Sequence, residues 1–263
     1  MTATLLKSKK GLVTGITNRR SIAYGIAKIL SEHGAELAIT YQNETVKERL
    51  LPIAIELNVE LVLSCDVANE VTIDAVFKAV EKKWGTLDFL VHAIAFSDKS
   101  ELSSKYVNTS LNNFLNAMHI SCYSFTALAQ RAEKMMRNIG SLLTLSYYGA
   151  EKVIPNYNVM GLCKAALEAS VKYLAYDLGP KNIRVNAISA GPVRTLASSG
   201  ISDFHFISKW NKNNAPLRRN VTIEDIGKAA LYLLSDLSSG TTGEILHVDS
   251  GYNIVGMKVI DSN

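Results

Sequence analysis

The sequence predicts an α/β fold in which helices cover both faces of a parallel, doubly wound sheet. Short β-rich runs alternate with amphipathic helical patterns along the chain, which is typical of βαβ units. Hydrophobic residues make up 48% of the 263 residues, enough to bury a sheet on both faces. We expect seven strands, at residues 11–14, 36–40, 60–64, 87–94, 141–146, 183–188 and 244–248.

The chain is expected to form a single domain over residues 1–263. No linker rich in Pro, Ser or Gly, no low-complexity tract and no repeat divides it. It has no run of eighteen apolar residues that would span a bilayer. The lysines within residues 1–10 follow the few apolar residues there, unlike the arrangement in a signal peptide. We therefore expect a soluble, cytoplasmic protein.

The first strand leads into a glycine turn and a helix. The strand breaks at Gly15 into a loop, and the next helix starts near Ser21 and stops at Gly34. Backbone N–H groups at such a helix start can hold a pyrophosphate, so this segment predicts a Rossmann-type dinucleotide site. The spacing of Gly15, Ser21 and Gly25 nevertheless departs from the G-x-G-x-x-G pattern. The helix carries an apolar face and small residues suited to close approach of the sheet: Ile22, Ile26, Ile29 and Leu30, and Ala23, Gly25 and Ala27.

The later helices are clearest at residues 71–84 and 223–234. The first of them has one apolar stripe, formed by Ile73, Val76, Phe77, Val80 and Trp84. Ligands of open parallel sheets bind beyond the carboxyl ends of the strands. The residues at those ends are therefore candidates for the site: Gly15, Tyr41, Gln42, and residues 65–67, 93–96, 146–148 and 190–192.

A tyrosine and a lysine seven residues apart, Tyr157 and Lys164, give the strongest chemical signal. In a helix that begins near Asn158 this spacing is two turns, so the phenol and the ammonium should project toward a common site. Tyr147 ends the apolar run that precedes them. A phenol that shares a proton beside an amine that fixes hydroxyl groups suits carbonyl or enolate chemistry. The pattern indicates a reductase.

The cysteines and histidines suggest no further chemistry. Cys65, Cys122 and Cys163 are too few and too scattered for a disulfide framework, so we expect reduced thiols in the core. The five histidines show no metal-binding spacing. No metal site is expected.

Several segments together resemble the NADH-dependent enoyl-[acyl-carrier-protein] reductases, a divergent branch of the short-chain dehydrogenase/reductase superfamily. The resemblance covers residues 10 to 257. Its segments are TG (14–15), RSIAYGIA (20–27), TYQN (40–43), CDV (65–67), VHAIAF (91–96), LTLSY (143–147), IPNYNVMG (154–161) through Lys164, RVNAISAGP (184–192) and VTIED (221–225).

A ketoacyl-type reductase of the same superfamily is the nearest alternative. Those enzymes place the catalytic tyrosine four residues before the lysine, where this chain has Met160. They also carry Asn-Asn-Ala-Gly after the fourth strand, and here residues 92–95 read His-Ala-Ile-Ala. Ala95 stands where the enoyl reductases would have Gly. A methyl group there is a small change, and we expect it to be tolerated.

The resemblance implies transfer of a hydride from NADH to the β-carbon of a trans-2-enoyl thioester in fatty acid elongation. Tyr157 would donate a hydrogen bond to the enolate oxygen, and Lys164 would bind the nicotinamide ribose. Tyr147 would lie beside the substrate, with a less definite role. The implied substrate contacts are Ser97, Tyr147, Tyr157 and Met160.

The resemblance also implies the cofactor contacts. They are Gly15, Ser21 and Ile22 at the pyrophosphate, Gln42 near the adenosine ribose, Asp66 and Val67 at the adenine, Ile94 beneath the ribose, and Val193, Arg194, Thr195, Leu196 and Ala197 along the nicotinamide, with Lys164 at its ribose. A 2′-phosphate would require a nearby Arg or Lys. Residues 40–44 offer neither, which favours NADH, although Lys47 and Arg49 follow closely.

The segment at about residues 194–213 is implied to be a mobile substrate lid. Residues 194–201 are mostly small and suit a loop, and the stretch that follows carries apolar side chains suited to a fatty chain. These side chains are Phe204, Phe206, Ile207 and Trp210.

The net charge of the chain and the family that it resembles both indicate which partners it would bind. A net charge of +4, with the charges interspersed, argues against nucleic-acid binding. Basic residues near the lid would suit an acidic acyl carrier protein: Lys209, Lys212, Arg218 and Arg219. The family implies a homotetramer, and the apolar segment at residues 245–257 is compatible with an interface.

A catalytically idle NAD-sensing module is the alternative from another functional class, but it leaves Tyr147, Tyr157 and Lys164 without a role.

Overall fold

The computed structural model describes residues 4–137, 139–196, 198 and 204–257 of the chain. Its seven strands form one sheet in the order β3-β2-β1-β4-β5-β6-β7, and every neighbouring pair is parallel. All seven predicted strands are confirmed, with small shifts at their ends. They are β1 (Lys10–Val13), β2 (Glu36–Tyr41), β3 (Leu61–Ser64), β4 (Phe89–His92), β5 (Gly140–Ser146), β6 (Ile183–Ala190) and β7 (Ile245–Val248).

The strand order reverses direction beside β1. The chain builds β1, β2 and β3 outward to one edge, returns to place β4 on the other side of β1, and then continues to β7. This is the predicted doubly wound arrangement, in which a crevice opens between the two halves at the carboxyl ends of the strands.

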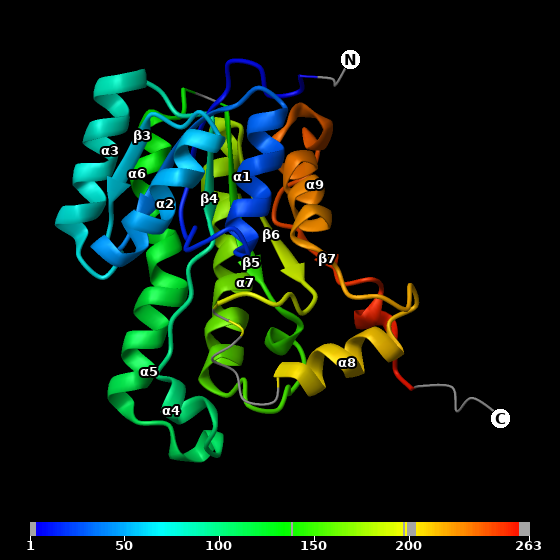
Figure 1. The fold of residues 1–263 in the computed structure, drawn as a ribbon. Coiled ribbons are helices and arrows are strands. Elements are labelled where there is room, and N and C mark those ends of the chain that lie inside the picture. Colours follow the sequence, from blue (N-terminus) through cyan, green and yellow to red (C-terminus); the bar gives the residue numbers. More distant parts are fainter. Residues whose placement is uncertain (1–3, 138, 197, 199–203, 258–263) are drawn as a thin grey trace.

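Helices cover both faces of the sheet (Figure 1). One face packs against α1 (Ile22–Glu32), α2 (Glu44–Glu56) and α9 (Ile223–Leu234), and the other against α3 (Glu70–Trp84), α6 (Ser124–Met135) and α7 (Val159–Leu178). Side chains of a strand alternate between the faces. Leu143 of β5 lies in the first apolar cluster, and its neighbour Leu142 lies in the second.

Three further helices extend beyond the carboxyl ends of the strands (Figure 1). They are α4 (Lys99–Leu102), α5 (Leu111–Met118) and α8 (Phe204–Asn214). A π-helical turn, η2 (His119–Tyr123), joins α5 to α6. The 3₁₀ turns are η1 (Tyr106–Asn108), η3 (Tyr148–Ala150), η4 (Gly179–Lys181), η6 (Asp236–Ser238) and η7 (Tyr252–Ile254). Within the described ranges, no helix is long and apolar enough to cross a membrane.

The small residue Gly25 has a different neighbour from the one predicted. We expected the sheet to approach it closely, but the closest group is the backbone of α9. A Cβ at Gly25 would lie 2.5 Å from the carbonyl oxygen of Ile223, and one at Gly227 would lie 2.6 Å from the carbonyl oxygen of Gly25. The two glycines let α1 and α9 pack with their backbones nearly in contact.

Replacing Gly25 with Ala should therefore destabilise the fold. In a helix interior, Ala is favoured over Gly by about 1 kcal/mol, but overpacking at the Ile223 carbonyl is expected to outweigh this and lower the free energy of unfolding by about 1–3 kcal/mol. Urea denaturation measures the change. The control is Gly179→Ala, because a Cβ at Gly179 meets nothing within 4 Å. Equal stability of the two variants would contradict the close contact.

Candidate functional site

The predicted dinucleotide turn lies where β1 ends. Thr14 is fully buried, and its hydroxyl donates to the carbonyl oxygen of Val91 at 3.0 Å, which ties β1 to β4. Gly15 follows with φ +86°, and a Cβ there would lie 2.0 Å from the Ala93 carbonyl oxygen. Both the backbone angle and the contact exclude a side chain at this position. Gly15 therefore lets the chain pass close to the β4 end.

The loop after Gly15 leads to the first turn of α1. Ser21 is the residue before the helix, and its side chain makes no capping hydrogen bond. Its hydroxyl instead accepts the N–H groups of Thr17 and Asn18 and donates to the Asn18 carbonyl oxygen. The hydroxyl thus folds the loop and does not occupy the N–H groups of the helix start, where an anion binds favourably.

The predicted adenosine contacts follow β2 and β3. Gln42 is exposed just after β2, and Asp66 and Val67 follow β3. Lys47 is one of the two cations, with Arg49, that left the choice of cofactor open. It pairs with Glu44 at 3.0 Å and lies 5.5 Å from the centre of the Tyr41 ring. These contacts raise the pKa of Lys47, mainly through the Glu44 hydrogen bond.

Tyr147 and Tyr157 form an aromatic pair. Their ring centroids are 5.0 Å apart in an edge-to-face arrangement. Tyr147 directly follows β5, and Tyr157 is buried with Met160 and Cys163 in an apolar cluster. The structure thus brings together two of the residues predicted to do the chemistry, and it places Met160 against them.

The way in which Tyr157 reaches this position differs from the prediction. The helix α7 begins at Val159, so Tyr157 lies in the preceding turn and not on the helix face that carries Lys164. Asn156 and Asn158 both have positive φ, of 61° and 40°. Asparagine tolerates this region better than most residues, so the Asn-Tyr-Asn triplet was the available sequence signal.

Two glycines that the sequence analysis did not single out shape the space around Tyr157. A Cβ at Gly149 would lie 2.4 Å from Cδ1 of the Tyr157 ring, and one at Gly161 would lie 2.8 Å from the Gly149 carbonyl oxygen. The side chain of Asn158 donates to the carbonyl oxygens of Glu101, Leu102 and Ser104, at 3.0, 3.1 and 2.7 Å. The turn that carries Tyr157 is therefore held on two sides.

Burial keeps both phenols protonated. It raises the pKa of Tyr147 to about 12, and it raises the pKa of Tyr157 well above its ordinary value, with smaller contributions from Tyr147, Cys163 and Glu168. At neutral pH both side chains are hydrogen-bond donors.

Lys164 is a buried ammonium at the end of β5. Only 6% of its surface is exposed, and Nζ donates to the carbonyl oxygen of Leu145 at 2.7 Å. Burial lowers its pKa to about 8, while Cys163, Cys122 and Glu168 oppose this shift. The positively charged Lys164 thus joins α7 to the end of β5, two residues before Tyr147.

His92, to which the sequence analysis assigned no role, supports the same edge. It is fully buried at the end of β4, with Nδ1 2.8 Å from Thr144 Oγ1 and Nε2 2.8 Å from Ser124 Oγ. Burial and the charge of Lys164 lower its pKa to about 3. His92 is therefore neutral, and it links three elements without adding a second positive charge.

The segment predicted to follow the nicotinamide comes after β6. Val193 and Thr195 are partly buried, whereas Arg194 and Leu196 are exposed. The Thr195 N–H donates to Ser198 Oγ at 2.8 Å, and the Ser198 N–H donates to Thr195 Oγ1 at 3.0 Å. Ala197 lies outside the described residues, as does part of the predicted lid.

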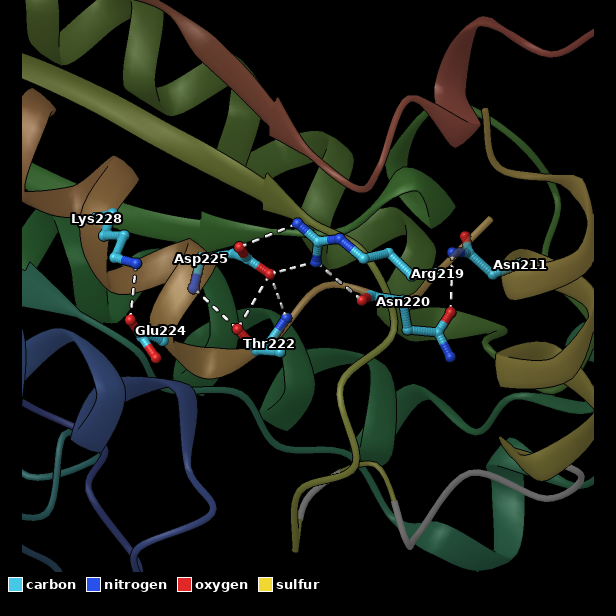
Figure 2. A network of polar contacts seen from close by, with 7 residues as sticks. All are labelled: Asn211, Arg219, Asn220, Thr222, Glu224, Asp225 and Lys228. Atoms are coloured by element: carbon cyan, nitrogen blue, oxygen red, sulfur yellow. Dashed lines mark hydrogen bonds and ion pairs between the residues drawn. The ribbon is translucent and has the colours of Figure 1, made fainter. Parts of the chain in front are cut away.

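The apolar stretch after the predicted loop forms the helix α8, and its packing is unusual. Its buried residues are Asn211 and Asn214, while Phe206 and Trp210 are 59% and 50% exposed. Asn211 donates to Asn220 Oδ1 at 3.1 Å (Figure 2). Amide hydrogen bonds hold α8, and two aromatic side chains remain accessible.

Arg219 is engaged within the fold (Figure 2). Its guanidinium donates to both carboxylate oxygens of Asp225, at 2.6 and 3.2 Å, and to the Asn220 carbonyl oxygen. Asp225 forms a capping box with Thr222 at the start of α9. All four basic residues near the lid are exposed, and two of them, Lys209 and Lys212, lie on α8.

The cysteines are buried free thiols, as predicted. Burial raises the pKa of Cys65 and of Cys163 to about 11 and also raises that of Cys122, so all three stay protonated near neutral pH. The described part of the chain contains no group of three or more His, Cys, Asp or Glu residues that could hold a metal ion.

The fold is that of the doubly wound dinucleotide-binding proteins, and comparison with known proteins identifies the family. A family model described as enoyl-(acyl carrier protein) reductase matches residues 15–253. The enoyl-[acyl-carrier-protein] reductase [NADH] 1 of Rhizobium meliloti (strain 1021) is 62% identical over 258 residues, covering 98% of this chain and 95% of the relative. The NADH enzyme of Escherichia coli (strain K12) is 49% identical over 97% of this chain and 98% of the relative.

A solved structure agrees with these relatives. The enoyl-(acyl-carrier-protein) reductase from Anaplasma phagocytophilum, in complex with NAD, matches with a TM-score of 0.94 and 61% identity. The match covers 99% of this chain and 97% of that one. The chain belongs to the enoyl-[acyl-carrier-protein] reductase family.

Proposed function

We propose that this protein uses NADH to reduce the trans-2 double bond of an enoyl chain carried as a thioester by acyl carrier protein. Family membership supports the reaction and the cofactor. One observation carries the proposal for this chain: the Tyr147–Tyr157 pair forms directly after β5, and the buried Lys164 binds the backbone near the end of the same strand.

The chemistry at the carbonyl end of the substrate is assigned to Tyr157. NADH supplies, when bound, the hydride that adds to the β-carbon. Charge then develops on the thioester oxygen, and a phenol already aimed at that oxygen stabilises the transition state more than the ground state. Burial keeps the Tyr157 hydroxyl protonated for this role. Tyr147 packs edge-to-face against Tyr157 and limits the positions its ring can take.

The dinucleotide is assigned to the remaining strand ends. The start of α1 takes the pyrophosphate, with Gly15, Ser21 and Ile22. Lys164 binds the nicotinamide ribose with its ammonium, and the pairing of Lys47 with Glu44 supports NADH over NADPH. The other assigned contacts are Gln42 at the adenosine ribose, Asp66 and Val67 at the adenine, Ile94 beneath the ribose, and residues 193–197 along the nicotinamide.

The acyl chain is assigned to the apolar side of the tyrosine pair. Met160 and Leu102 belong to the buried cluster around Tyr157, and the half-exposed Phe206 of α8 offers further apolar surface. Ser97 completes the assigned substrate contacts. The exposed Lys209 and Lys212 are the surface that we assign to acyl carrier protein, because opposite charge favours docking of an acidic partner.

The whole chain, residues 1–263, is assigned to one cytoplasmic domain that assembles as a homotetramer. Its apolar C-terminal segment supports the assembly, since Ile254 and Met257 are 76% and 86% exposed. Sedimentation equilibrium tests the tetramer, and a monomer at micromolar concentration would contradict it.

No observation favours a ketoacyl reductase, since Met160 occupies the position of the catalytic tyrosine of those enzymes.

The reaction is tested by following NADH absorbance with two thioesters. We expect oxidation with a crotonyl thioester and none with an acetoacetyl thioester. The reverse result would indicate a ketoacyl reductase. Binding of NADH without oxidation by either thioester would indicate a sensing module.

Tyr157→Phe removes only the hydroxyl and should lower kcat by about 10²–10³, the usual loss for one pre-organised donor at an oxyanion. The affinity for NADH should stay near that of the wild type, because the hydroxyl is assigned to the substrate. Steady-state kinetics and a fluorescence titration measure both quantities. Wild-type turnover in a folded variant would exclude Tyr157 as the donor and transfer the role to Tyr147.

The affinity for NADH should fall as the pH rises through the pKa of Lys164. That pKa is lowered to about 8, so the charged form dominates at pH 7 and the neutral amine at pH 9. If only the ammonium binds the ribose, the dissociation constant should increase about ten-fold between these two pH values. The pKa values of the neighbouring tyrosines are too high to titrate in this range.

Lys164→Ala is the matched variant for this titration. It should bind NADH about 10- to 100-fold more weakly at pH 7, the usual effect of losing a hydrogen bond from a charged group, and the pH dependence should disappear. A variant with unchanged affinity, or with the same pH dependence, would refute the assignment of Lys164 to the ribose.

A further inference from the structure

The turn η2 places a serine against the loop that follows β4. Ser121 is fully buried, and its hydroxyl accepts the N–H of Phe96 at 2.9 Å and donates to the Phe96 carbonyl oxygen at 3.0 Å. A serine hydroxyl can accept and donate at the same time. One side chain therefore satisfies both backbone groups of a residue 25 positions earlier in the chain.

The loop held in this way consists of residues 93–98, which belong to neither helix nor strand. It contains Ile94 and Ser97, which we assign to the cofactor and the substrate. In the described part of the chain, the backbone of Phe96 has no hydrogen-bond partner other than Ser121. The Ser121 hydroxyl also lies 3.9 Å from Sδ of Met160. It thus touches both sides of the proposed substrate site.

Two other side chains of the α5–η2–α6 segment hold the ends of the loop. At its start, His92 is 2.8 Å from Ser124. At its end, Asn113 accepts the N–H of Asp98 at 2.9 Å. In an uninterrupted α-helix, Asn113 and Ser121, eight residues apart, would differ by about 80° around the axis. The wider i→i+5 turn reduces this difference, so η2 helps both residues to face the same loop.

We propose that Ser121 is a positioning residue, whose hydroxyl fixes residues 93–98 against the nicotinamide and the acyl chain. The inference rests on the proposed function. The loop has no ladder hydrogen bonds. Asn113 also binds the Ser97 hydroxyl, but Ser121 binds both backbone groups of Phe96. Small errors in the placement of reacting groups lower the rate strongly. Ser121 does not contact the reacting atoms and acts through Phe96.

The main variant is Ser121→Ala, which leaves both Phe96 groups without their partner. We expect kcat/KM for a crotonyl thioester to fall about 10- to 100-fold, with a lower kcat and a higher KM for the thioester. Ser121→Cys fills nearly the same space with a weak donor and should also lose activity. If Ser121→Cys had wild-type kinetics, the loss of activity in Ser121→Ala would come from lost packing and not from lost hydrogen bonds. That result would overturn the proposal.

Ser141→Ala is the matched control. Ser141 is 3% exposed, and its hydroxyl donates to the Leu233 carbonyl oxygen at 3.0 Å, near the opposite end of β5 from the site. It should lower thermal stability by a similar amount and leave both kinetic constants unchanged. If Ser121→Ala changes KM no more than this control does, its role is only structural and the proposal is wrong.

Hydrogen exchange of residues 93–98, measured by mass spectrometry without any ligand, tests whether Ser121 holds this loop independently of the reaction. Exchange should accelerate in Ser121→Ala and not in Ser141→Ala. Unchanged exchange would show that Ser121 does not hold the loop, whatever the activity, and would refute the proposal. Faster exchange with unchanged kinetics would refute its role in catalysis, and a wild-type protein that fails to oxidise NADH with the crotonyl thioester would refute the proposed function itself.

Discussion

Parallel pairing of all seven strands is the constraint from which the site follows. Because no strand runs against the others, every carboxyl end lies at the same edge, and segments more than a hundred residues apart in the chain meet there. Gly15 follows β1, and Tyr147 follows β5. The close approach of Gly15 to the Ala93 carbonyl shows how tightly adjacent strand ends are packed. A side chain at that position would separate the two halves of the crevice.

The electrostatics of this edge depend on one buried cation. Lys164 donates to the carbonyl oxygen of Leu145, and its ammonium is close enough to His92 to help keep that ring neutral. His92 still forms two hydrogen bonds, so it joins β4 to β5 and α6 without charge repulsion. Of these two groups, only Lys164 carries a positive charge, and the phenols of Tyr147 and Tyr157 stay protonated.

The fold could be predicted almost completely, because alternation of apolar runs and amphipathic helices is a local property of the sequence. The residue types proposed for the site come from the family resemblance, whereas their geometry could not be predicted. Tyr157 precedes α7 because two asparagines take positive φ, which periodicity does not reveal. Nor does it reveal the turn η2, which brings Ser121 to the loop after β4. Small residues such as Gly25 indicated a close neighbour without showing that it was α9.

The packing of α8 has a thermodynamic consequence. Its buried residues are asparagines, bound through amide groups such as that of Asn211, while Phe206 and Trp210 already face outward. Lifting this helix would exchange protein hydrogen bonds for hydrogen bonds with water, and it would also expose the partly buried Phe204 and Ile207. The heat capacity change on exposing polar groups is negative, whereas that on exposing apolar surface is positive. The two contributions oppose each other, so the enthalpy of moving α8 would depend less on temperature than that of exposing an equal area of the apolar core.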